Sequence, residues 1–159
     1  ERGVHATFFL MGKNIEGKEA LVKQIQEEGH LIGNHTYNHV QLDKISKEAA
    51  KEEIETTNQK IFEITGVYPA WLRPPYGEWR KNLDFYVEMF PVLCDVDTLD
   101  WKSKNVDSIM KIVRSEVSDG AVILMHDAYQ SSVDAALQIV DLLMAEEYEF
   151  VTVEELILP

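Results

Sequence analysis

The chain has 159 residues, a formal net charge of −13 from 28 acidic and 15 basic side chains, and 45% hydrophobic residues. This length and apolar content are typical of a globular protein with a sizeable core, and we expect one domain over residues 1–159. The negative charge argues against a nucleic-acid partner and against contact with an anionic membrane surface. The single Cys94 excludes an internal disulfide and leaves the compartment open, as the composition leaves the oligomeric state open.

Apolar runs and amphipathic segments alternate about six times along the chain. The runs predict strands at 4–11, 30–34, 70–72, 92–96, 121–125 and 150–153, and helices at 18–28, 46–65, 81–90 and 106–117. A last helix begins at Ser131 or Ser132, with an apolar stripe of Val133, Ala136, Leu137, Val140, Leu143 and Met144. We expect Ser46 to cap the second helix and Gly66 to end it. The alternation predicts an α/β fold with a mostly parallel sheet, open or closed into a barrel.

Polar or proline-bearing segments follow four of the predicted strands, at 33–39, 73–77, 97–101 and 126–127. The carboxyl ends of the strands build the active site in folds of this kind. Within the first segment, His35 and His39 are four residues apart, which would place both imidazoles on one face of a helical turn and let them hold one metal ion. The alternative is a surface turn whose histidines cap a helix or bond to the backbone.

These segments, read together, resemble the polysaccharide deacetylases, the NodB-homology domain of carbohydrate esterase family 4. The resemblance rests on ATFFL at 6–10 followed by Gly12, GHLIGNHTYNH at 29–39, RPPYG at 73–77, DTLDW at 97–101 and LMH at 124–126. It implies a distorted (β/α) barrel and metal-dependent removal of acetyl groups from N-acetylated sugars. The first family motif, an Asp-Asp pair that supplies a third metal ligand and the catalytic base, would precede Glu1. We therefore expect the first βα unit to be missing from the chain as given.

The resemblance assigns roles to the polar residues. His35 and His39 would bind a divalent ion, for which zinc is the default and cobalt or another divalent ion an alternative. Arg73 would orient the base carboxylate, or form an ordinary surface ion pair. Tyr76 would help to hold the oxyanion through its backbone N–H, unless its ring only packs. His126 would be the general acid that protonates the leaving amine.

Other residues are assigned to support and substrate binding. Asp100 is similar to the family carboxylate that bonds to the acid histidine and raises its pKa. Trp101 and Leu124 resemble the apolar wall beside the acetyl methyl group, with core packing as the alternative, and Pro75 belongs to the same substrate-binding group. Asp97 and Asp127 are candidates for a supporting role. Trp71 and Trp79 could stack on a sugar ring or lie in the core.

The leading hypothesis is an N-deacetylase acting on a polymer that contains N-acetylglucosamine, with peptidoglycan favoured over chitin-like or xylan-like glycans. Such substrates imply an extracellular or cell-surface location. A catalytically inactive glycan-binding or structural domain is the main alternative, because the Asp-Asp motif is absent from the chain. An amidohydrolase acting on a small molecule is a third hypothesis, which HxxxH and DxxDW together disfavour.

Overall fold

The computed structural model describes residues 2–79 and 87–158. The chain divides into two compact units. We call His5–Leu93 with Thr152–Glu154 the N-terminal unit, and Glu1–Val4, Cys94–Val151 and Glu155–Pro159 the C-terminal unit.

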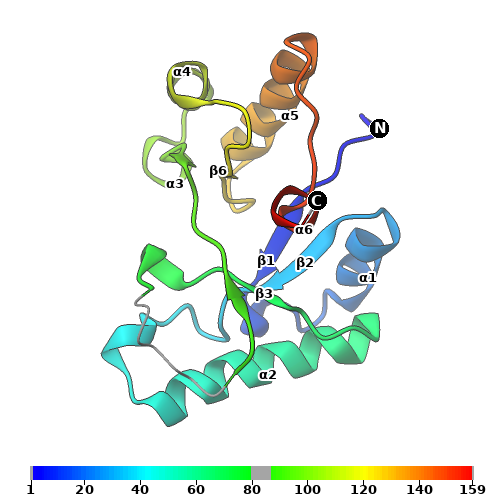
Figure 1. Cartoon of the computed structure of the whole chain (residues 1–159), viewed down its shortest axis with the longest axis vertical. Helices are drawn as coiled ribbons and strands as arrows, with labels where there is room; N and C mark the ends of the chain where they lie inside the picture. The colour runs from blue at the N-terminus through cyan, green and yellow to red at the C-terminus, as the bar shows by residue number, and fades with distance from the viewer. Residues whose placement is uncertain (1, 80–86, 159) are drawn as a thin grey trace. The chain divides into compact units, whose positions relative to one another are not determined.

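The N-terminal unit contains a four-stranded parallel sheet in the order β1 (Thr7–Leu10), β2 (Leu31–Asn34), β3 (Trp71–Leu72), β4 (Phe90–Pro91). Strands β1, β2 and β3 lie side by side (Figure 1). Thr7 is paired with Leu31, and Asn34 at the end of β2 is paired with Leu72 at the end of β3. Because these two strands end side by side, the segments that follow them, 35–41 and 73–77, begin next to each other.

The described residues of this unit also form the helices α1 (Glu19–Glu27) and the long α2 (Lys47–Thr65), with short 3₁₀ turns at Gly12–Asn14, Leu42–Lys44 and Pro75–Gly77. The predicted ends of α2 are confirmed. The Ser46 hydroxyl accepts a hydrogen bond from the Ala49 N–H at 3.2 Å, and Gly66 ends the helix with a φ of 74°. Two buried clusters join the helices to the strands: Ile15, Val22, Ile32 and Ile61 form one, and Leu42, Ala50, Ile54 and Leu72 the other.

The C-terminal unit contains the parallel pair β5 (Val96–Asp97) and β6 (Ile123–Leu124), with α3 (Asp100–Ser103), α4 (Val106–Glu116) and α5 (Gln130–Ala145). Its core lies where α4 packs against α5 and consists of Ile109, Met110, Val113, Ala135, Ile139 and Leu143. The last helix of the chain is α6 (Val153–Ile157). The α/β class with parallel strands is thus confirmed, whereas barrel closure and the single domain over 1–159 stay predictions.

Two of the predicted strands are wrong. Residues 92–96 do not form one strand, because β4 ends at Pro91 and β5 begins only at Val96. Residues 150–153 are not a strand either. The Val153 N–H donates to the Thr7 hydroxyl at 3.0 Å, and α6 begins at Val153. An apolar run with β-branched residues is therefore not sufficient evidence of a strand at this place. Most of the predicted helix at 81–90 lies outside the described residues.

The predicted start and apolar stripe of α5 also need correction. The helix begins at Gln130 without a side-chain cap, so neither Ser131 nor Ser132 is its N-cap. Leu143 is buried as predicted, but three other stripe residues, Val133, Leu137 and Met144, are exposed. The other buried residues of the helix are Ser132, Ala135 and Ile139. Because Ser132 is polar, a prediction based on hydrophobicity alone leaves it out and shifts the expected buried face of α5 around the helix axis, away from the observed one.

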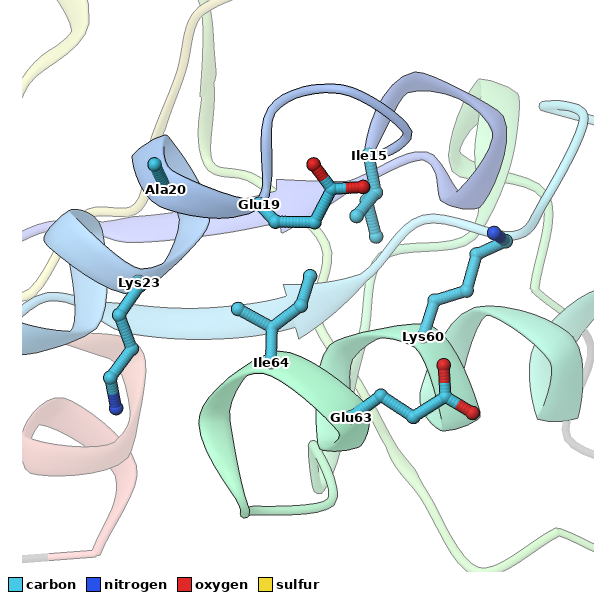
Figure 2. A pocket seen from close by; sticks show the side chains of 7 residues that line it. All are labelled: Ile15, Glu19, Ala20, Lys23, Lys60, Glu63 and Ile64. Carbon is cyan, nitrogen blue, oxygen red and sulfur yellow. The ribbon is translucent and has the colours of Figure 1, made fainter.

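A surface pocket of about 480 Å³ lies between α1 and α2. Figure 2 shows Ile15 and Ile64 facing each other there, with charged side chains around them. No predicted site residue lines this pocket. Over the described parts of the chain, every helix is too short or too polar to cross a bilayer.

Candidate active site

The loop after β2 carries the two candidate metal ligands, and it is not helical. Thr36 and His39 both have a φ of 61°, which only a left-handed backbone provides. This conformation, rather than an i, i+4 helical face, brings the rings of His35 and His39 to 4.7 Å between centroids. The predicted helical turn is therefore wrong, whereas the predicted proximity of the two imidazoles is confirmed.

Asn34, the last residue of β2, holds this loop in place. It is fully buried, and its amide donates to the Ile54 carbonyl at 2.8 Å and to Asn58 Oδ1 at 2.7 Å. Its Oδ1 accepts the Thr36 N–H at 2.7 Å, and the Thr36 hydroxyl in turn accepts the His39 N–H at 3.1 Å. This chain of bonds supports the left-handed residues. Sequence reasoning missed the role of Asn34, although an amide side chain at the end of a buried strand was a usable signal.

The ring of His35 is oriented by the neighbouring strand. Its Nδ1 lies 2.6 Å from the backbone carbonyl oxygen of Arg73. Because a carbonyl oxygen only accepts, Nδ1 carries the proton and the Nε2 of the neutral ring carries the lone pair. Metal-binding histidines typically donate their second ring N–H in this way, so His35 fits a metal ligand. No cluster of three or more His, Cys, Asp or Glu side chains suited to a metal occurs among residues 2–79 and 87–158.

The RPPYG segment forms a 3₁₀ turn at Pro75–Gly77 in which Tyr76 has a φ of 61°. Pro75 is buried, whereas Tyr76 is 68% exposed. The Tyr76 ring packs edge to face against the His39 ring, with 4.8 Å between the two ring centroids. Arg73 Nη2 donates to the Leu93 carbonyl at 3.0 Å, and the guanidinium lies 4.9 Å from the centre of the Phe9 ring. Within the N-terminal unit, His35, His39, Arg73 and Tyr76 thus form one cluster.

A second cluster lies in the C-terminal unit, around the fully buried Asp100. Its Oδ1 lies 2.8 Å from His126 Nδ1, and its Oδ2 accepts the His126 backbone N–H at 2.7 Å. Both the ring and the main chain of His126 are therefore fixed by one carboxylate, and the side chain of His126 remains 38% exposed. The predicted bond between Asp100 and the candidate acid His126 is present in the structure.

The pKa of Asp100 lies below its ordinary value. Burial raises this pKa, but hydrogen bonds from the side chain and backbone of His126, with a smaller effect from Ser132, together outweigh burial. A buried carboxylate with these donors stays ionised at neutral pH. The arrangement can hold an imidazole by Nδ1 while Nε2 exchanges a proton with another group.

Comparison with known proteins decides the family. The sequence model described as polysaccharide deacetylase matches residues 1–91. The chain belongs to this family. It is 37% identical over 153 residues to the peptidoglycan-N-acetylglucosamine deacetylase PgdA of Listeria monocytogenes, and the match covers 96% of the chain and 33% of that protein.

Solved structures of family members agree with the fold. The peptidoglycan deacetylase PdaC of Bacillus subtilis has a TM-score of 0.93 at 36% identity, over 98% of this chain and 77% of that one. A family pseudoenzyme from Bacillus anthracis has a TM-score of 0.88 at 28% identity, over 96% of this chain and 55% of that one. The chain spans about a third of the length of the curated relatives it matches first.

In this family member, the structure places the remaining predicted residues as follows. Trp101, 49% exposed, is not a core residue, and Leu124 is half-buried in β6. Asp97 Oδ1 accepts the Leu99 N–H at 3.0 Å, which supports the turn before Asp100, whereas Asp127 is exposed.

The two tryptophans near the RPPYG segment have packing roles. Trp71 is buried in β3, so its ring is not open to a sugar. Trp79 packs against the cluster that contains Leu42 and Ile54.

Proposed function

We propose that this chain catalyses metal-dependent removal of N-acetyl groups from a polysaccharide that contains N-acetylglucosamine, and that the substrate is peptidoglycan. The observation that supports catalysis most directly is the buried, ionised Asp100 bonded to His126 at 2.8 Å. Peptidoglycan is favoured because relatives at 37% identity carry that substrate in their names. Such a substrate implies work at the cell surface or outside the cell.

His35 and His39 would hold a divalent ion, with zinc preferred for a donor set of imidazoles and a carboxylate. The Nδ1–H of His35, bonded to the Arg73 carbonyl at 2.6 Å, supports ligation through Nε2. The family resemblance assigns the third ligand to the Asp-Asp motif. When bound, such an ion polarises the substrate carbonyl and lowers the pKa of water.

The other residues act on the proton and on the developing charge. His126, held at Nδ1 by Asp100, gives the proton on its Nε2 to the departing amine nitrogen. Asp100 stabilises the charged imidazolium that makes this transfer. The backbone N–H of Tyr76 donates to the oxyanion, and Arg73 orients the carboxylate that acts as base.

Acetate release from N-acetylated peptidoglycan by the intact, zinc-loaded protein tests this proposal. We expect His126→Ala to lower kcat by at least about 100-fold, because general acid catalysis typically contributes 10²–10⁴-fold. The matched control is His30→Ala, since that ring accepts the Ala6 N–H at 3.2 Å within the N-terminal unit and has no assigned role in catalysis.

The same assay separates this proposal from an inactive, glycan-binding family member. Acetate release that depends on His126 supports the enzyme. Binding of peptidoglycan without acetate release from any N-acetylated glycan would overturn it in favour of the binding domain.

A further inference from the structure

The hydroxyl of Ser132, on the first turn of α5, has no role in the reaction so far described. The residue is 1% exposed, and its Oγ has no partner of ordinary hydrogen-bond geometry among the described groups. Its backbone N–H donates a hydrogen bond to the Tyr129 carbonyl at 3.0 Å. A buried hydroxyl without a partner costs free energy, so its place in the core requires a reason.

The acceptor sites of Asp100 suggest that reason. An ionised carboxylate offers about four lone-pair positions, two on each oxygen. Oδ1 receives the Trp101 N–H and His126 Nδ1, both at 2.8 Å. Oδ2 receives the His126 N–H at 2.7 Å, which leaves one position on Oδ2 that the described donors do not fill.

Ser132 lies on the first turn of α5, and α5 packs against α3, the helix that begins at Asp100. Consistent with this packing, the Ser132 side chain is among the groups that lower the pKa of Asp100, although its Oγ is outside ordinary hydrogen-bond geometry. The hydrogen of a serine hydroxyl rotates about the Cβ–Oγ bond, and the side chain has three staggered rotamers about Cα–Cβ, so an adjustment of these torsions can align the hydroxyl with the carboxylate.

We propose that Ser132 is a positioning residue whose hydroxyl donates the fourth hydrogen bond to Asp100, at Oδ2, and so keeps the carboxylate turned toward His126. The inference rests on the proposed function only where it links Ser132 to catalysis. The hydrogen bond itself is a property of the C-terminal unit alone.

A ¹³C NMR titration of the Asp100 carboxyl tests the bond without substrate or metal. In Ser132→Ala the carboxyl should titrate at a higher pH than in the unsubstituted protein, because the anion loses a donor. Ser131→Ala is the matched control, since it removes the same hydroxyl one residue away, and it should leave the titration unchanged.

Rescue and kinetics separate positioning from mere packing. Ser132→Thr keeps the hydroxyl and should restore the titration of the unsubstituted protein. On peptidoglycan, Ser132→Ala should lower kcat about tenfold with little change in KM, the effect of one hydrogen bond to a charged group.

An Asp100 carboxyl that titrates identically in Ser132→Ala and the unsubstituted protein would overturn the proposal. So would a folded Ser132→Thr variant that titrates like Ser132→Ala. If the unsubstituted protein releases no acetate, the proposed function fails, and the NMR titration still decides the role of Ser132.

Discussion

The carbonyl oxygen of Arg73 accepts a hydrogen bond from Nδ1 of His35 at 2.6 Å. This bond joins the segment after β3 to the segment after β2, whose ends are paired through Asn34 and Leu72. One backbone carbonyl therefore sets which nitrogen of His35 carries the lone pair. The parallel register of two short strands thus determines the tautomer of a candidate metal ligand.

Metal affinity should depend on both imidazoles of the HxxxH segment. We expect His35→Ala and His39→Ala each to weaken zinc binding by more than about 100-fold, because loss even of a group that only supports a ligand costs 10–100-fold. Isothermal titration of the intact protein with zinc, and with cobalt as a second ion, measures this. His30→Ala should bind both ions like the unsubstituted protein, and equal weakening by that control would contradict the assignment.

Asn34 should be among the most sensitive residues of the N-terminal unit. Asn34→Ala removes three buried hydrogen bonds, two from its amide and one to its Oδ1, and leaves the Thr36 N–H without that acceptor. We expect the free energy of unfolding to fall by about 2–3 kcal/mol. Urea denaturation measures the loss. Asn14→Ala, at an exposed position, is the control and should cost less than about 0.5 kcal/mol.

The left-handed backbone of Tyr76 gives a prediction in two directions. With φ at 61° and the ring 68% exposed, Tyr76→Gly relieves strain and should change the free energy of unfolding by less than about 0.5 kcal/mol. Tyr76→Val should cost about 1–2 kcal/mol, because a β-branched residue tolerates this φ poorly. Thermal denaturation of both variants measures the difference. Equal stability of the two would show that the turn does not impose this φ in solution.

The family and the long helix α2 were predictable from sequence patterns. The ends of α2 were predictable because a capping serine and a left-handed glycine act locally, through bonds within one turn. The bond between Asp100 and His126 was predictable only through the family resemblance, since 26 residues separate the two side chains.

The conformation of the HxxxH loop was not predictable from local rules. Thr36, His39 and Tyr76 all adopt a positive φ that their own residue types disfavour. At Thr36 and His39, hydrogen bonds that begin at the buried Asn34 support this conformation. The hydrophobic pattern also misplaces the buried face of α5, because the polar residue Ser132 is buried on that face.

The lowered pKa of Asp100 predicts how stability should vary with pH. The folded chain binds a proton at this carboxyl more weakly than the unfolded chain does. In the unfolded chain the pKa of an aspartate carboxyl is about 4. The ionised carboxylate therefore stabilises the fold above about pH 4, and this contribution is lost as the pH falls through the lower pKa of the folded state.

Asp100→Asn should consequently reduce the free energy of unfolding at pH 6 by about 3 kcal/mol, since the buried donors from Trp101 and His126 lose a charged acceptor. The difference from the unsubstituted protein should narrow as the pH is lowered below about 4. Urea denaturation at a series of pH values measures it. Asp127→Asn, which removes an exposed carboxylate next to His126, is the matched control and should change stability by less than about 0.5 kcal/mol throughout. A gap between Asp100→Asn and the unsubstituted protein that stays constant down to pH 2 would mean that Asp100 does not titrate below its ordinary range.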